Sequence, residues 1–210
     1  MRIYDGYLTM IPSVVALLPG IPISIWILRR DADRRWKLMA LLAVMHLSLL
    51  VALAIFPIPI AGQDYYRRTR GFSEDNVIPF ATISFQVQHL GLSTVRQLFG
   101  NAVALAPAGI YGPGLWPRLR NWRLFAVIAI AFGCGIELTQ LAGSLIEGFT
   151  YRVTDIDDAI MNASGAVAAF FVWREMERRG LVDRWFGRWL DPNRSTGAPV
   201  ATPPPARFPG

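Results

Sequence analysis

Residues 38–60, LMALLAVMHLSLLVALAIFPIPI, contain no charged side chain and only two polar ones, His46 and Ser48. A helix needs about 20 apolar residues to cross the hydrocarbon core of a bilayer, at about 1.5 Å of rise per residue. This stretch meets that requirement, and Pro57 and Pro59 end it because proline cannot continue a helix. We therefore expect a transmembrane helix here.

The composition of the whole chain agrees with a membrane protein. Of the 210 residues, 53% are hydrophobic and only 17% are charged, whereas a soluble domain carries roughly 25% charged residues. Prolines in the first of the remaining apolar stretches predict a kink near residues 19–22. The sequence thus predicts an all-α integral membrane bundle of about five transmembrane helices. The other four predicted spans are residues 7–28, 98–116, 124–146 and 159–173.

The distribution of basic residues predicts the orientation of these spans. Arginine and lysine are dense in alternate links, at 29–37 and 118–123, and again after the last span, at 174–188. Basic residues favour the cytoplasmic side of a membrane. An odd number of spans then places the N-terminus outside the cytoplasm and the C-terminus inside. The first span is expected to be retained and not removed as a signal peptide.

The segments outside the spans differ in character. The second half of the outer link 61–97 places Ile83, Val87, Leu90 and Leu98 on one helical face, which predicts an amphipathic helix in the outer interface. Aromatic residues recur among arginines in 174–190, which predicts an inner interfacial helix. Residues 191–210, rich in Pro, Ala, Ser and Thr, are expected to form a disordered tail. The transmembrane domain would thus comprise residues 1–173.

The net charge and the cysteine content limit which partners and ligands the protein is expected to bind. The net charge is +6, but the arginine clusters lie beside apolar spans. Membrane lipids are therefore the expected partners, and nucleic acid is not. The single cysteine, Cys134, allows no intrachain disulfide, and no Cys/His zinc pattern is present. No metal or cofactor is indicated, and the sequence does not predict the oligomeric state.

Several polar residues fall within or beside the apolar spans. Glu137 lies 14 residues after Arg123, roughly 21 Å from the inner face. A carboxyl group at such depth costs a few kcal/mol unless it is paired, protonated or in contact with water. The topology places the whole group in the outer leaflet: Asn101, Glu137, Gln140, Arg152, Asp155, Asp157, Asp158 and Asn162.

Two interpretations of this group remain open. In the first, the side chains join the helices. Asp155 or Asp157 would cap the last span, Arg152 would pair with Glu137 or an Asp, and Asn162 would bond to Asn101 or Gln140. In the second, Glu137, Arg152, Asp158 and Asn162 line an outward-facing pocket, because the carboxylates outnumber the nearby arginine. For Asp157 alone we favour the capping role.

Two further groups are expected to have structural roles. His46 is isolated among apolar residues and is expected to be neutral and bonded to a neighbouring helix. Small residues in three spans are expected to allow close helix packing. They are Gly133, Gly135, Ala163, Gly165 and Ala169.

Four short elements resemble the VanZ-like membrane proteins and together cover about residues 38–173. They are Asn76-Val-Ile-Pro-Phe80; Gly100-Asn101 with Pro107-Ala-Gly109; Ile136-Glu137-x-x-Gln140; and Arg152-x-x-Asp155-x-Asp157-Asp158-x-x-x-Asn162-x-x-Gly165. They occur in the order typical of that family. Tyr151 stands where a Gly commonly precedes the Arg, and Ala106 where a Phe commonly precedes the Pro.

The resemblance implies a multi-pass protein of the bacterial cytoplasmic membrane, in a family whose namesake confers low-level resistance to the glycopeptide teicoplanin. The family brings no established biochemical activity to carry over, and catalytic residues stay unassigned. The resemblance and the polar residues together give the candidate binding residues Asn76, Asn101, Glu137, Gln140, Arg152, Asp155, Asp158 and Asn162.

Three functions are compatible with these observations. The favoured hypothesis is a non-enzymatic envelope protein that binds a lipid-linked precursor, or a cell-surface or glycopeptide-related group, and so alters antibiotic access. The second is an enzyme acting on an envelope lipid or precursor, with Glu137 or Asp158 as general base or as ligand to a divalent cation. The third is a structural membrane scaffold.

Overall fold

The computed structural model describes residues 10–11, 13–55, 58–59, 75–88, 91–148, 150 and 152–182, which form a helical bundle. The predicted all-α class is confirmed, with one additional pair of two-residue strands, β1 (Met10–Ile11) and β2 (Ile58–Pro59), that are antiparallel. The helical elements are η1 (Ser13–Leu17), α1 (Gly20–Arg29), α2 (Arg34–Ala54), α4 (Ala81–Gln88), α5 (Leu92–Leu115), η2 (Pro117–Arg120), α6 (Trp122–Glu147) and α7 (Ile156–Arg178).

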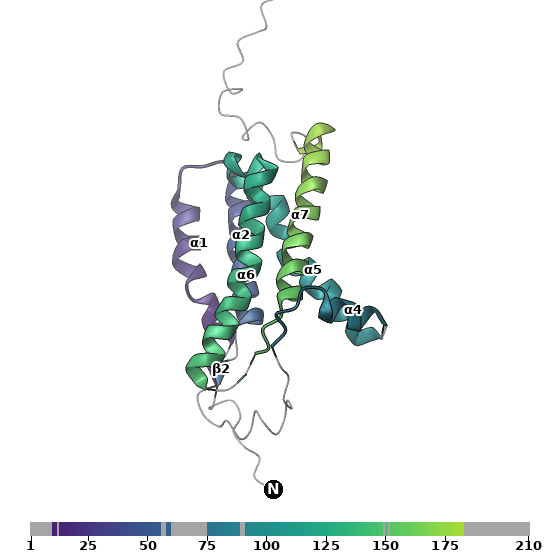
Figure 1. Cartoon of the computed structure of the whole chain (residues 1–210). Coiled ribbons are helices and arrows are strands. Elements are labelled where there is room, and N and C mark those ends of the chain that lie inside the picture. Colours follow the sequence, from purple (N-terminus) through teal and green to yellow (C-terminus); the bar gives the residue numbers. More distant parts are fainter. Residues whose placement is uncertain are drawn as a thin grey trace, which may run out of the picture.

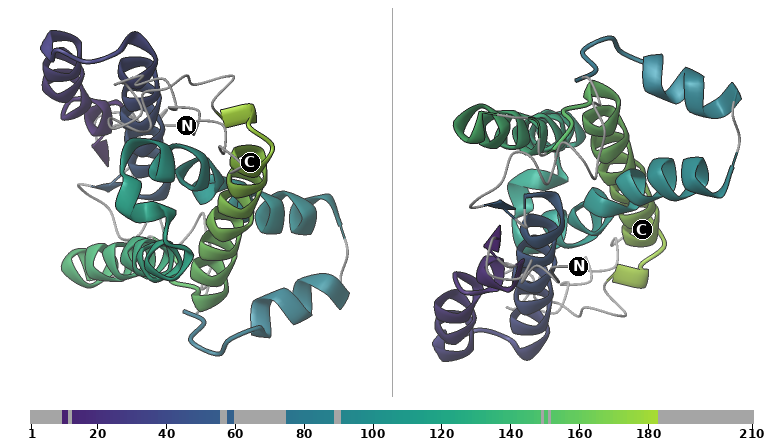
Figure 2. Two further views of the ribbon diagram at one scale, coloured as in Figure 1. Left: turned by 90° about the horizontal axis from the view of Figure 1, so that it is seen from above. Right: turned by 90° about the horizontal axis from the view of Figure 1, so that it is seen from below.

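The helices of the bundle lie side by side, with α4 projecting from one flank (Figures 1 and 2). Helix α7 packs most extensively against α5 and then against α6, while α2 contacts α1 and α5. The α1–α2 link, η2 and the C-terminal end of α7 lie at one end of the bundle, and the turn that precedes α7 lies at the other (Figure 1). Alternate links therefore share an end.

Glycines allow α7 to approach its two neighbours closely. A Cβ atom on Gly165 would lie 1.7 Å from the carbonyl oxygen of Ala102 in α5, and one on Gly109 would lie 2.3 Å from that of Ala166 in α7. A Cβ on Gly133 of α6 would lie 2.7 Å from the Ala159 carbonyl oxygen. The packing role predicted for Gly133 and Gly165 is confirmed. That predicted for Gly135 is wrong, because nothing lies within 4 Å of its Cβ position.

The first and the outer-link helices differ from the sequence-based expectation. Between residues 13 and 29 the chain forms η1 and α1, separated by a turn at Leu18 and Pro19 beside the expected kink. Ile83 and Val87 lie in α4, but Leu98 lies in α5, so the single amphipathic helix expected there is wrong. Gly91, in extended conformation at the N-cap of α5, starts a new helix.

At the C-terminal side, α7 continues to Arg178 without a break, so residues 174–178 belong to the helix that contains residues 159–173. Predictions that fall on residues 1–9, 12, 56–57, 60–74, 89–90, 149, 151 and 183–210, including the tail, concern residues outside those the structure describes.

Two of the described helices are long and apolar enough to cross a membrane, Arg34–Ala54 and Trp122–Ile146. Only 22% of the residues in the apolar window of each are buried by the rest of the protein. Large apolar side chains on both are open to the surroundings, including Met45 at 62% and Val127 at 63% exposure. A core helix of a soluble protein would bury such residues.

We expect Gly165→Ala to destabilise the protein by about 1–3 kcal/mol or to prevent its accumulation, because the added methyl group meets backbone that side-chain movement cannot relieve. Gly135→Ala is the matched control, since its added methyl group meets open space and alanine favours the helix. Thermal unfolding of both purified variants in detergent tests this. Equal melting temperatures for Gly165→Ala and the unchanged protein would contradict the packing described.

Candidate functional site

A turn between α6 and α7 holds the beginning of α7 in place. Asp155 is the N-cap of α7, and its Oδ1 accepts a hydrogen bond from the backbone N–H of Asp157 at 2.9 Å. The N–H of Asp155 itself donates to Oε2 of Glu137 in α6, also at 2.9 Å. Asp155 and Glu137 are both only 6% exposed. A buried carboxyl group of α6 therefore fixes the start of α7.

Asn76 joins the outer link to the same turn. Its N–H donates to the carbonyl oxygen of Thr154 at 2.9 Å, and its carbonyl oxygen accepts from the N–H of Ile156 at 3.0 Å. Its Nδ2 donates to Oδ1 of Asp155 at 2.9 Å. These hydrogen bonds attach the outer link to the turn that precedes α7, so Asn76 has a structural role here.

Asp157 has a role different from the one predicted for it. It is 1% exposed, and its two carboxylate oxygens accept hydrogen bonds from the backbone N–H groups of Phe80 and Ile83 at the start of α4. Those N–H groups have no partner within their own helix, and Phe80 carries no side-chain acceptor. Asp157 therefore caps α4 across 77 positions of sequence, while Asp155 caps α7. Local sequence rules detect only caps supplied by adjacent residues.

Gln140 and Arg152 both bind the C-terminal end of α2. Nε2 of Gln140 donates to the carbonyl oxygen of Ala54 at 2.8 Å, and Nη2 of Arg152 donates to that of Leu53 at 3.0 Å. The last carbonyl groups of a helix lack intrahelical donors and carry partial negative charge, so a cation is favourable there. This hydrogen bond of Arg152 goes to backbone, whereas the sequence predicts an ion pair with Glu137 or an Asp.

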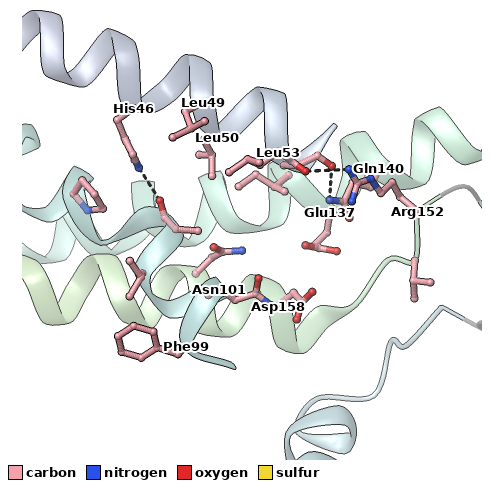
Figure 3. Close-up of a pocket in the computed structure, with 18 of the residues that line it drawn as sticks. His46, Leu49, Leu50, Leu53, Phe99, Asn101, Glu137, Gln140, Arg152 and Asp158 are labelled. Atoms are coloured by element: carbon pink, nitrogen blue, oxygen red, sulfur yellow. Dashed lines mark hydrogen bonds between the residues drawn. The ribbon is translucent and has the colours of Figure 1, made fainter. Parts of the chain in front are cut away.

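A pocket of about 820 Å³ opens among α2, α5, α6 and α7 beside these contacts (Figure 3). Asn76 and Asp155 do not line it. The structure therefore brings most of the predicted binding residues to one cavity, and two of them, Asn76 and Asp155, lie outside its lining. The predicted residues that line the pocket are Asn101, Glu137, Gln140, Arg152, Asp158 and Asn162.

Apolar side chains line the pocket as well. Among them are Leu49, Leu50 and Leu53 of α2 and, on the other side of the pocket near Asn101, Phe99 of α5 (Figure 3). The sequence does not distinguish these residues from the many that face outward, since a leucine in a pocket and a leucine facing lipid have the same local sequence. The pocket consequently has a mixed lining of polar and apolar side chains.

His46 also lines the pocket, and its predicted bonding to a neighbouring helix is confirmed. Its Nε2 lies 2.7 Å from the carbonyl oxygen of Ala104, and its Nδ1 lies 3.0 Å from the hydroxyl of Tyr111, both in α5. A carbonyl oxygen only accepts, so Nε2 carries the proton. His46 thereby joins α2 to α5.

Several polar atoms of the pocket lack partners in the described part of the chain. Oδ1 of Asn162, a residue only 4% exposed, and Nδ2 of Asn101 are buried without a hydrogen bond. Among the described residues, the one hydrogen bond that Glu137 accepts comes from the N–H of Asp155, at Oε2. An unsatisfied buried polar group costs about 1–3 kcal/mol. The pocket therefore holds polar groups that a ligand or water would satisfy.

The pocket contains two carboxyl groups, those of Glu137 and Asp158, that lie close to each other. Glu137 and Asp158 are close enough to interact electrostatically, while Gln97 and Asn101 present side-chain amides to Asp158. In Figure 3 the side chains of Glu137 and Asp158 point into the same space. Like charges at short range raise the free energy of the pair unless a cation, a proton or hydrogen-bond donors compensate. Among the described residues, no cluster of three or more His, Cys, Asp or Glu is placed to hold a metal ion.

A family model described as VanZ/LLP1 matches residues 43–178, and the chain belongs to this family. No curated protein matches the chain. No solved structure matches it either.

We expect Asp157→Asn to weaken the attachment of α4, because the amide offers one acceptor where the carboxylate offers two and removes a charge-assisted interaction of about 1.5–3 kcal/mol. Hydrogen exchange at the amides of Phe80 and Ile83 measures this directly and should become faster. Asp158→Asn is the control, since no backbone N–H of α4 donates to Asp158. Unchanged protection of both amides in Asp157→Asn would refute the capping role.

Proposed function

We propose that the chain is a multi-pass protein of the bacterial cytoplasmic membrane that binds a lipid-linked or cell-surface polar group in an outer-leaflet pocket. The observation that carries this proposal is the 820 Å³ pocket, whose lining combines polar groups that lack hydrogen-bond partners among the described residues with apolar side chains. A ligand with a polar head and a hydrocarbon part matches such a lining.

Helix length and surface character support a membrane location. Helices α2, α5, α6 and α7 contain 21, 24, 26 and 23 residues, and at about 1.5 Å per residue each is as long as the roughly 30 Å hydrocarbon core. With the apolar segment Val14–Arg29, which comprises most of η1 and all of α1, they cover the sequence of the five proposed spans, of which α2 and α6 are long and apolar enough by themselves. Exposed apolar side chains on α2 and α6 would face acyl chains.

Charge distribution supports the proposed orientation. The arginine-rich α1–α2 link, η2 and the end of α7 share one end of the bundle (Figure 1), which the positive-inside rule assigns to the cytoplasm. The Asp-rich turn at residues 152–158 lies at the other end. In this orientation the pocket opens near the outer surface, where binding of an envelope precursor would alter the access of glycopeptides such as teicoplanin.

Labelling of single cysteines tests the orientation. In a Cys134→Ser background, Val77→Cys, at a position 77% exposed in the outer link, should react with a membrane-impermeant maleimide on intact cells. Asp31→Cys, in the α1–α2 link, should react only after the cells are permeabilised. Labelling in the reverse order would contradict the proposed orientation.

Lipid retention tests the binding function. Glu137→Gln preserves shape but removes the charge, and the loss of a charge-assisted interaction of about 1.5–3 kcal/mol should weaken binding about ten- to a hundredfold. Native mass spectrometry of the full chain, incubated with a phospholipid extract of bacterial inner membrane, measures the fraction of protein that carries lipid. Glu175→Gln is the control, because Glu175 lies on the far part of α7 and pairs with Arg178 and Arg179. Equal lipid retention by both variants and the unchanged protein would contradict the proposal.

A further inference from the structure

The polar pocket adjoins an apolar groove between α2 and α5. The groove has a volume of about 760 Å³ and shares His46, Val103 and Pro107 with the pocket. On α2 it extends from His46 back to Arg35, a distance of about 16 Å along the helix axis. Pocket and groove are therefore neighbours, one with polar and one with apolar lining, and His46, hydrogen-bonded to Ala104 of α5, lies where they meet.

The polar end offers mainly acceptors. The carboxyl groups of Glu137 and Asp158 only accept hydrogen bonds when they are ionised, and Oδ1 of the buried Asn162 is an acceptor without a partner. A primary ammonium group carries three N–H donors and one positive charge. It would satisfy these acceptors and reduce the repulsion between the two carboxylates.

The same end also offers one donor, Nδ2 of Asn101. It lies buried in the pocket wall and is near enough to interact with the Asp158 carboxyl group, but it makes no hydrogen bond of good geometry within the described residues. An acceptor oxygen close to the ammonium group, such as a phosphate oxygen, would satisfy it. The positive charge of Arg152 in the same wall also favours a phosphate.

The groove is suited to a hydrocarbon chain. Its α2 side is formed by Leu38, Leu42 and Met45, which recur at helical spacing and are 59%, 49% and 62% exposed. The groove is thus open sideways, toward the bilayer under the proposed function. A chain attached to a head group in the pocket would enter the groove past His46, without leaving the hydrocarbon phase.

We propose that pocket and groove together bind an amphiphile with a primary ammonium and phosphate head group, held among Glu137, Asp158 and Asn162, and a hydrocarbon chain along α2 and α5. The inference rests on the proposed function and specifies its ligand class. An amine-bearing phospholipid of the membrane is the ligand to which this chemistry points.

Binding of defined lipids tests the head-group assignment. The full chain in detergent is titrated with dioleoyl phosphatidylethanolamine, phosphatidylglycerol and phosphatidylcholine, and the bound fraction is followed by native mass spectrometry. We expect phosphatidylethanolamine to bind at least about tenfold more tightly than the other two, the factor that one charge-assisted hydrogen bond supplies. Equal affinities, or no binding of the three phospholipids, would overturn the assignment of the ligand class, whereas the proposed function is refuted only if lipid retention from the membrane extract is also the same in Glu137→Gln, Glu175→Gln and the unchanged protein.

Asn162→Leu separates a ligand-binding role from a structural one. It removes an acceptor that has no partner in the described chain, so we expect an unchanged or higher melting temperature together with the loss of preference for phosphatidylethanolamine. Asp158→Asn should reduce the same preference. A lower melting temperature in Asn162→Leu with the preference unchanged would show that Asn162 joins helices and would overturn its assignment to the head group.

Chain binding is tested in the groove itself. Ala106→Phe places a ring in the groove. It should weaken the binding of all three phospholipids to the same extent, without changing their order of affinity. Ala142→Phe, at an exposed position of α6 outside the groove, is the control. Soluble glycerophosphoethanolamine should bind far more weakly than the diacyl lipid, and equal binding of the two would exclude a chain in the groove.

Discussion

The backbone of the turn at residues 152–158 is held by buried carboxylates, and the arrangement of the site depends on this constraint. Glu137 accepts the N–H of Asp155, Asp155 caps α7, and Asp157 caps α4. The Asp155 cap is local, whereas the hydrogen bonds of Glu137 and Asp157 join positions 18, 77 and 74 residues apart, so the turn fixes α4, α6 and α7 relative to one another. Near a bilayer these backbone groups have few other partners, because hydrocarbon offers none. The acidic side chains Asp155 and Asp157 in the turn therefore hold the backbone in place.

The same constraint explains how structural and binding roles divide among the polar residues. The side chains of Asn76, Asp155 and Asp157 form hydrogen bonds to backbone groups, and Asn76 and Asp155 also bond to each other. None of the three lines the pocket. Gln140 and Arg152 bind the end of α2 while also facing the cavity. The other predicted residues that line the pocket are Asn101, Glu137, Asp158 and Asn162, and their polar atoms can accept or donate further hydrogen bonds. The two interpretations of the cluster thus apply to different members of it.

The sequence predicted the helical class and the main helices, because apolar runs such as 38–60 depend only on local composition. It also predicted that Glu137, Arg152, Asp158 and Asn162 would lie together, because charged groups within apolar spans are stable only where they meet other polar groups or water. It did not predict the cap on α4, because Asp157 reaches it from another helix. Nor did it predict the apolar lining of the pocket or the groove, since Leu53 facing a cavity and Leu53 facing lipid have identical local sequence.

An experimentally determined structure of the full chain in a lipid nanodisc would show whether carboxyl and amide groups of α5, α6 and α7 enclose the polar end of a lipid-binding space. We expect elongated density that starts between Glu137 and Asp158 and continues along the groove between α2 and α5. A Glu137 carboxyl group turned away from Asp158 and Asn162, toward the surrounding acyl chains, would contradict it.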